Sequence, residues 1–352
     1  MAHISAALAR RPDLSLAQWA PPGDMDHRVD YAATPEEAVW LATLMQRGGI
    51  SHLLRSKPVA GLAATTKLLR RLHALYRRRD DDLYHVNWLQ CALPLPADGK
   101  PALMTVLGND MRLLRLPAMR GALRRVMKGR SVVICPNAAW MEAPLRMAFG
   151  DRAAIVPVPF GIDPRWYAIE RTAAELCRPP RWLAVTRLTA NKLGSLFEWS
   201  APLFADRKRE LHLFGPMQEQ VPVPDWVHYH GSATPEQLAS EWFPHAHGLI
   251  TLSRHAEGRP QVMLEAMASA LPIIASRMPA HADIVSDGAT GALCDMPDAY
   301  AAALVGIENP DTNLRMGAAA RAWVTREIGT WDDCATRYTT LYRRLLDHSP
   351  HG

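Results

Sequence analysis

The sequence has few residues that could cross-link it and no apolar run long enough to span a membrane. Its five cysteines are an odd number, lie far apart and show no metal-ligand spacing, which argues against a disulfide framework and fits a reducing compartment. No apolar run reaches the ~18 residues that a spanning helix needs. Residues 1–12 lack the apolar core of a secretory signal. We therefore expect a cytoplasmic protein.

Metal-binding motifs are also lacking. The 14 histidines form no HExxH motif, so we expect neither a metal ion nor a cofactor. A pair of carboxylates can hold a divalent metal, and Asp80-Asp81-Asp82 offers such a pair. The run follows Arg77-Arg78-Arg79 and precedes a predicted strand at residues 83–88, however, so a charged turn between a helix and a strand is the better interpretation.

Positive charge is in excess and is unevenly distributed. The net charge is +5, of which residues 1–165 carry +9 and the remainder −4. Such a basic half could face anionic lipid or nucleic acid. Aromatic residues do not interleave with the basic ones as they do in RNA-binding modules, so we expect no nucleic-acid partner.

Much of this charge falls on residues 59–79, which are predicted to form an amphipathic helix. Two interpretations stay open. The helix is an ordinary domain helix with a solvated basic face, or that face docks on anionic lipid at the inner side of the plasma membrane. The predicted apolar face carries Leu68, Leu72, Leu75 and Tyr76, and the basic face Lys67, Arg70, Arg71, Arg77 and Arg78.

Strand–helix units repeat along most of the chain, and 352 residues suffice for two domains. Such units predict an α/β protein with parallel sheets covered by helices. Ligands bind at the carboxyl ends of the strands in these folds. Arg187, Gly215, Ser253 and Glu257 all follow predicted strands, so we expect them at one binding edge.

One stretch of the second half combines two carboxylates with a helix start. Glu257 lies in a loop before Pro260, which can open a helix because the first turn needs no N–H. Glu265 then falls about two turns into the helix, roughly 10 Å further along its axis. A sugar and a ribose at the ends of a diphosphate are separated by a similar span, and a helix N-terminus attracts phosphate. The alternative is a capping acid followed by a solvated helix acid.

This stretch resembles the nucleotide-sugar motif of retaining GT-B glycosyltransferases, specifically glycosyltransferase family 4. The family pattern is a strand ending in Ser, a Glu-Gly pair, a helix with a second Glu, and a small-residue strand. The matching residues are Ser253, Glu257-Gly258, Pro260, Glu265-Ala266-Met267-Ala268 and Pro272.

Two further elements extend the resemblance. Residues 159–163 are similar to the pNGvD element of the family, and Arg187 and Lys192 to its GRL…K element, although Thr186 replaces the usual Gly. The resemblance covers residues 155–345 well and residues 83–155 loosely.

The resemblance implies an α/β fold of the GT-B type, two Rossmann-like domains with parallel sheets facing across a cleft. It implies transfer of a sugar from a nucleoside diphosphate to a saccharide or lipid-linked acceptor with retention, in polysaccharide or cell-envelope glycan synthesis. Arg187 and Lys192 would bind the diphosphate, Glu257 the sugar hydroxyls and Glu265 the ribose. The other expected donor-site residues are Gly215, Ser253, Gly258 and Arg259.

In the first half, family members often carry a Thr, a His-Gly pair and an Asp beside the cleft. This chain has Leu107-Gly108 without the histidine, then Asp110. Asp110 is the candidate for contact with sugar or acceptor, or else closes an Asx turn.

We expect a first domain at residues 1–165, a donor-binding domain at 166–329 and a helix at 330–352 that returns to the first domain. Residues 164–180, rich in proline, would form the linker. The first strand and Gly-rich loop of the family are not apparent. That departure and the missing histidine both support one alternative, a non-catalytic GT-B binding or scaffold protein. A nucleotide-sugar epimerase on the same fold is a third interpretation that stays open.

Overall fold

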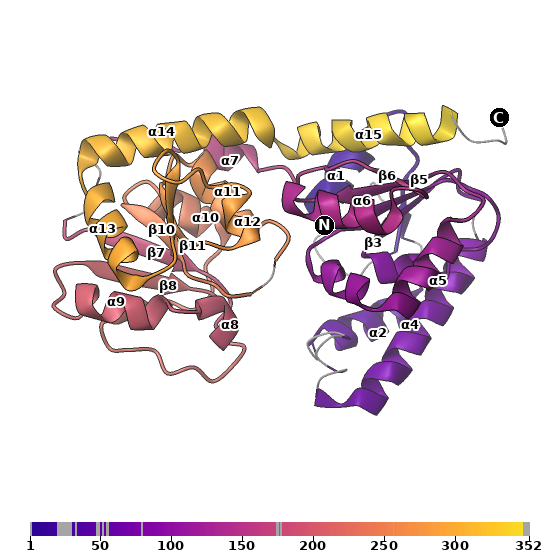
Figure 1. The fold of residues 1–352 in the computed structure, drawn as a ribbon, viewed down its shortest axis with the longest axis horizontal. Coiled ribbons are helices and arrows are strands. Elements are labelled where there is room, and N and C mark those ends of the chain that lie inside the picture. The colour runs from indigo at the N-terminus through magenta and orange to yellow at the C-terminus, as the bar shows by residue number, and fades with distance from the viewer. Residues whose placement is uncertain are drawn as a thin grey trace. The chain divides into compact units, whose positions relative to one another are not determined.

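The structure is a computed structural model, and the chain divides into two compact units (Figure 1). Unit 1 comprises Met1–Pro159 and Trp331–Gly352, and unit 2 comprises Phe160–Thr330. The residues that the structure describes are 2–19, 30–31, 34–46, 50, 53, 56–78, 80–173, 176, 178–255 and 257–347.

Unit 1 is built on a parallel sheet with the strand order β3-β4-β5-β6. Every residue of β4 and β5 is buried, as expected for central parallel strands that are covered on both faces. The strands are β3 (Tyr84–Asn87), β4 (Ala102–Val106), β5 (Val132–Pro136) and β6 (Ala154–Ile155). The helices that follow them include η1 (Leu89–Ala92), η2 (Asn109–Arg115), α5 (Pro117–Met127) and α6 (Glu142–Phe149).

The last helix, α15 (Trp331–Asp347), belongs to unit 1 and is held to its sheet by polar groups that are buried or partly buried. His85 on β3 lies 2.6 Å from the Tyr342 hydroxyl through Nδ1 and 2.8 Å from Thr105 Oγ1 through Nε2. Thr105 Oγ1 is also 3.0 Å from the Tyr338 hydroxyl. Burial lowers the pKa of His85 to about 4, so the network is neutral at pH 7 and fixes the register of α15.

Ahead of this sheet, unit 1 contains a helical region and a small parallel pair of strands. These elements are α1 (Ala2–Ala9), β1 (Ala17–Gln18), β2 (Asp30–Tyr31), α2 (Pro35–Gln46) and α4 (Pro58–Arg78). The predicted absence of the first strand of the family stays a prediction, because residues 20–29 lie outside the described part.

The amphipathic helix forms as predicted and is α4. Leu72 is buried on its inner face, whereas Lys67 and Arg71 lie over the ring of Trp40 at 5.0 and 4.7 Å. Among the described residues, neither α4 nor any other helix is long and apolar enough to span a membrane.

Unit 2 is built on a parallel sheet with the order β12-β11-β10-β7-β8-β9. Successive side chains enter different cores, because they point to opposite faces of a strand. Leu183 of β7 packs in one core, and Trp182 and Ala184 in the other. The strands are β7 (Arg181–Val185), β8 (Glu210–Phe214), β9 (Val227–Tyr229), β10 (Gly248–Thr251), β11 (Ile273–Ser276) and β12 (Gly291–Cys294).

Helices cover this sheet between the strands. They include α7 (Pro164–Tyr167), α8 (Ala190–Leu193), α9 (Leu196–Phe204), α10 (Pro235–Gln237), η5 (Leu238–Trp242), α11 (Gln261–Ala268), α12 (Pro279–Ala282), α13 (Pro297–Ile307) and α14 (Pro310–Glu327).

The structure corrects the start of the linker that was expected at residues 164–180. Unit 2 already begins at Phe160, and Ile162, Trp166 and Ile169 are buried in its core. Pro164 occupies the first turn of α7, which Asp163 caps through Oδ1. Proline was thus a helix-start signal here, and the structural boundary lies six residues ahead of the expected 165/166 boundary.

Candidate functional site

The loops after β7, β8 and β10 meet at one edge of the unit 2 sheet because two glycines permit close backbone approach. At Gly215, just after β8, φ is 135° and a Cβ would lie 1.8 Å from the Thr186 carbonyl oxygen. At Gly194, after α8, φ is 56° and a Cβ would lie 1.9 Å from the Leu252 carbonyl oxygen. Both positions require glycine, and they bring the expected site loops together.

Lys192 and Glu257, 65 residues apart in sequence, form an ion pair between Nζ and Oε1. Thr189 begins α8 by accepting a hydrogen bond from the Lys192 N–H, and so sets the position of the lysine. The two side chains are 12% and 21% exposed. The pair is therefore largely buried but can be reached by a ligand.

Ser253 is one of the residues expected in the donor site, and it holds the loop that carries Glu257. It is buried, and its Oγ accepts a hydrogen bond of 3.1 Å from the His255 N–H. Its carbonyl oxygen accepts one of 2.7 Å from Ser276 Oγ on β11. Ser253 thus ties β10 to β11 and positions the loop before Glu257.

Arg259 is engaged by a neighbour in unit 2. Its Nε is 3.0 Å from Asp283 Oδ2, and its Nη2 also contacts that oxygen. The two side chains are only 9% and 5% exposed. A buried ion pair is costly to break, so the expected contact of Arg259 with the donor stays a prediction that would need the pair to open. The adjoining Gly258 is buried.

Arg187 contrasts with Arg259 in being exposed. Its Nη1 lies 3.3 Å from Gln218 Oε1, a neutral partner. Because Gln218 is neutral, it does not balance the positive charge of Arg187, which can therefore attract an anionic ligand at this edge.

Glu265 has an unpartnered carboxylate within the described part of the chain. It lies on α11, is partly buried, and receives neither a hydrogen bond nor an ion pair from any described residue. Burial raises its pKa to about 7, and the nearby charge of Asp163 adds to the shift. Such a carboxylate would gain from hydrogen bonds that a ligand could supply.

His281 on α12 is a residue that sequence reasoning missed at this edge. It is fully buried, and its Nδ1 lies 2.8 Å from the Ser276 carbonyl oxygen. Its Nε2 has no hydrogen-bond partner among the described residues. Burial lowers its pKa, on which Glu257 and Lys192 act in opposite directions. The neutral ring donates from Nδ1, so Nε2 is left as an acceptor that meets no described donor. Its place just after β11 is a sequence signal that could have found it.

Asp110 lies in unit 1 and bonds to the backbone. Its carboxylate, 2% exposed, accepts hydrogen bonds of 2.9 Å from the N–H groups of Leu89 and Leu107. These contacts tie Asp110 to two earlier stretches of the backbone, whereas an Asx turn would bond to the N–H two residues further on. A role of Asp110 toward sugar or acceptor stays a prediction.

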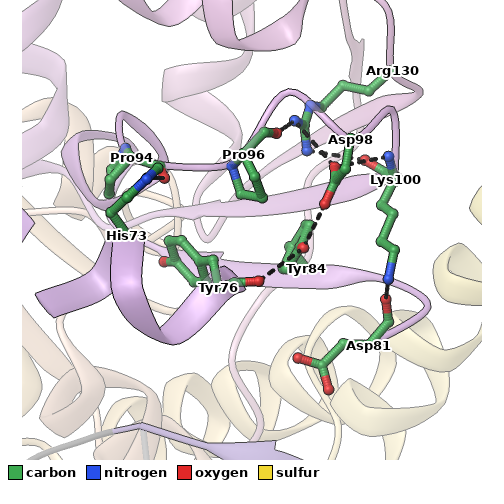
Figure 2. Close-up of polar contacts among 9 residues, drawn as sticks. All are labelled: His73, Tyr76, Asp81, Tyr84, Pro94, Pro96, Asp98, Lys100 and Arg130. Atoms are coloured by element: carbon green, nitrogen blue, oxygen red, sulfur yellow. Dashed lines mark hydrogen bonds and ion pairs between the residues drawn. The ribbon is translucent and has the colours of Figure 1, made fainter. Parts of the chain in front are cut away.

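The acidic run at residues 80–82 lies in a turn that Lys100 holds. The ammonium group of Lys100 donates to Asp80 Oδ1 at 2.6 Å and to the Asp81 carbonyl oxygen at 2.7 Å. Figure 2 shows the neighbouring contacts, in which the Tyr84 hydroxyl donates to Asp98 and Arg130 reaches two backbone carbonyls. The run is thus a charged turn, as the sequence indicated.

Comparison with known proteins identifies the fold. Residues 179–309 match the family model described as "Glycosyl transferases group 1". Over 98% of this chain and 92% of the other, the structure is similar to sucrose-phosphate synthase from Thermosynechococcus elongatus, with a TM-score of 0.72 at 19% identity. The chain has the GT-B fold. The predicted fold class, α/β with two parallel-sheet units, is therefore confirmed.

Other known proteins match the chain over differing shares of its length. Anabaena HepE, solved in complex with UDP and glucose, overlaps 90% of this chain and 91% of its own with a TM-score of 0.59 at 13% identity. A curated relative from Mycobacterium tuberculosis is 27% identical over 73% of this chain and 75% of its own. It is named GDP-mannose-dependent alpha-(1-6)-phosphatidylinositol monomannoside mannosyltransferase. A D-inositol 3-phosphate glycosyltransferase from Streptomyces griseus is 33% identical over 36% of this chain and 27% of its own.

Proposed function

We propose that this protein is a glycosyltransferase, a hexosyltransferase of family 4 that takes a sugar from a nucleoside-diphosphate donor with retention of configuration. The observation that carries the proposal is the carboxylate of Glu265, which has no hydrogen-bond or ion-pair partner among the described residues and stands on the helix that begins just after Glu257. A ribose with two hydroxyl donors would satisfy this carboxylate, and the GT-B relatives named above make a nucleotide the ligand to consider first.

The diphosphate would lie between Glu257 and Glu265 at the start of α11. No side chain from the described part of the chain caps this helix, and its first turn holds no acidic residue, so its N–H groups and dipole favour an anion. Arg187 and Lys192 would add positive charge. When Lys192 turns to the phosphate, Glu257 loses its ion partner and can accept hydrogen bonds from the sugar. His281 Nε2 offers one further acceptor.

The proposed reaction needs no nucleophile from the protein. The bond between the anomeric carbon and the diphosphate oxygen breaks, and the acceptor oxygen bonds to that carbon on the same face. The acceptor proton passes to the departing phosphate. Negative charge grows on the nucleoside diphosphate in this step, and fixed cations at Arg187 and Lys192 stabilise it.

The acceptor is proposed to be a saccharide or a lipid-linked saccharide in polysaccharide or cell-envelope glycan synthesis. The Mycobacterium relative acts on a phosphatidylinositol mannoside by its name, which supports a lipid-linked acceptor and GDP-mannose as the first donor to test. UDP-sugars are the second choice, because HepE was solved with UDP. We place the reaction in the cytoplasm, at the inner face of the membrane.

Turnover is expected to be independent of divalent metal, because cationic side chains take the place of a metal beside the diphosphate. Transfer or donor hydrolysis would be measured after treatment with chelator, with and without added Mg²⁺ or Mn²⁺. Equal rates are expected. Loss of turnover on chelation and its return with either ion would contradict the proposed roles of Arg187 and Lys192.

The basic face of α4 is expected to bind anionic vesicles in a salt-sensitive way. Val59 and Leu62 are 85% and 64% exposed beside this face, and surface arginines contribute about 1 kcal/mol each near anionic lipid. Changing Arg70, Arg77 and Arg78 together to Gln should weaken vesicle binding by roughly 100-fold.

The control carries the same loss of charge at exposed positions of unit 2. Changing Lys208, Arg315 and Arg326 to Gln should leave vesicle binding close to that of the wild type. If both triple variants bind alike, α4 does not dock on the membrane.

A further inference from the structure

Side chains with metal-ligand chemistry gather on one face of the unit 2 sheet, on β8 and the neighbouring strand β9. Glu210 and His212 are two residues apart on β8 and therefore point to the same face. His228 on β9 pairs with His212 in the strand register, so its side chain lies beside that of His212 on this face. One carboxylate and two imidazoles therefore lie together on this face of the sheet.

The ligand atoms are close enough to surround one ion. His212 Nε2 and Glu210 Oε2 are 3.1 Å apart, and the ligand atoms of Glu210, His212 and His228 all lie within 4.8 Å of one another. Tetrahedral Zn²⁺ with ligands at about 2.1 Å separates them by roughly 3.4 Å. A side-chain rotation of His228, which is exposed, would close the remaining gap.

His212 is already oriented by a second histidine. Its Nδ1 lies 2.9 Å from His230 Nε2, and the two rings are stacked at 5.1 Å. A metal-binding imidazole usually donates its other ring N–H to a fixed acceptor, which sets the tautomer, and His230 Nε2 can be that acceptor. If Nδ1 donates to His230, the Nε2 lone pair of His212 faces the Glu210 carboxylate. A metal cation between these two acceptors would satisfy both of them.

We propose that Glu210, His212 and His228 bind a divalent transition-metal ion, with Zn²⁺ as the ion best suited to two imidazoles and a carboxylate. The site is separate from the proposed donor site, whose residues follow β7, β8 and β10. Its effect is to clamp β9 to β8 and stabilise unit 2. Water would complete the coordination on the open side, where Glu210 and His228 reach solvent.

Arg181 is the charge that opposes this site. Its Nε lies 3.6 Å from Glu210 Oε2, whereas His212 Nε2 lies 3.1 Å from the same oxygen. Its guanidinium also lies over the ring of Trp242 at 5.2 Å, which offers the cation a second favourable contact. Glu210 therefore keeps an oxygen for the metal.

The test is calorimetric titration of untagged, chelator-treated protein with Zn²⁺, together with the visible absorption of bound Co²⁺. We expect one saturable site at micromolar metal. His228→Ala should weaken it by more than the ~10–100-fold that loss of an outer-shell partner costs, and Glu210→Gln should weaken it as well. His73→Ala, the same change at an exposed histidine of α4, should leave the affinity unchanged.

A second readout is the melting temperature of the full-length protein, in which the metal would stabilise unit 2. A hundredfold excess of Zn²⁺ over Kd should raise it by about 5–10 °C in the wild type and not in His228→Ala. Without metal, His228→Ala should melt close to the wild type, because His228 is exposed. Absence of saturable binding, or equal binding by the wild type and both ligand variants, would overturn the proposal.

Discussion

Replacing Glu265 by alanine is expected to weaken the binding of nucleoside diphosphates by about 10- to 100-fold, because charge-assisted hydrogen bonds to ribose hydroxyls contribute roughly 1.5–3 kcal/mol. Isothermal titration calorimetry with GDP and UDP measures the loss. Glu198 provides a matched control, since it is an acid on the surface of α9, and Glu198→Ala should bind as the wild type does. Equal affinity of Glu265→Ala and the wild type would remove Glu265 from the site.

The raised pKa of Glu265 gives this prediction a pH dependence. With a pKa of about 7 in the folded protein, the carboxylate that accepts ribose hydroxyls is more populated at pH 8 than at pH 6. Nucleotide affinity should therefore rise across this range in the wild type, and the rise should be smaller in Glu265→Gln.

The same group should have the opposite effect on stability. The ordinary pKa of a glutamate side chain is 4.5, and that of Glu265 in the folded state is about 7, so the folded chain binds this proton more tightly than the unfolded chain does. The free energy of unfolding then falls as pH rises from about 4.5 to 7. Glu265→Gln should thus be more stable than the wild type at pH 8, by up to ~3 kcal/mol, while it binds nucleotide less well. Denaturant unfolding at pH 5 and pH 8 tests both signs.

Lys192→Ala is expected to lower kcat by about 100-fold and to change the affinity for nucleoside diphosphate much less. In the free protein the lysine is engaged by Glu257, and its charge is needed most when the diphosphate departs. Interactions that strengthen only in the transition state raise kcat and leave ground-state binding nearly unchanged. One preorganised charge of this kind contributes about 10²- to 10³-fold. Rates of donor hydrolysis and calorimetric affinities would be compared for the same preparations.

Lys192→Arg is the companion variant, because it keeps the charge and alters its shape. It should retain affinity and recover part of the lost turnover. Melting curves must show that both variants are folded, since Lys192→Ala leaves Glu257 without its ion partner. Unchanged kcat in folded Lys192→Ala would show that this cation does not act on the leaving group.

Much of the fold could be predicted because hydrophobic runs and turns are local signals. Buried strands such as residues 273–276, with helices between them, were enough to predict parallel sheets. The rule that loops at the carboxyl ends of parallel strands share one edge then placed Lys192 and Glu257 at the same edge of unit 2. Only the structure shows that they form an ion pair, because no local pattern links residues that far apart.

Other features depended on tertiary packing and were not predictable. Arg259 stood in the expected motif, yet its pairing with Asp283 depends on how the loop before α11 meets the end of α12. Proline composition suggested a linker where Trp166 is in fact a core residue. A search for sequence motifs found no metal site, because Glu210 and His212 meet His228 only through the pairing of β8 with β9.

The central claim is tested most directly by titrating the wild-type protein with GDP and UDP in a calorimeter, and by following hydrolysis of GDP-mannose and a UDP-sugar in the same preparation. The account predicts one saturable site for at least one of the two nucleotides and measurable hydrolysis of the matching donor. Binding without hydrolysis would indicate a non-catalytic GT-B protein. If neither nucleotide binds, the assignment of Glu257, Glu265 and the start of α11 as a donor site is contradicted.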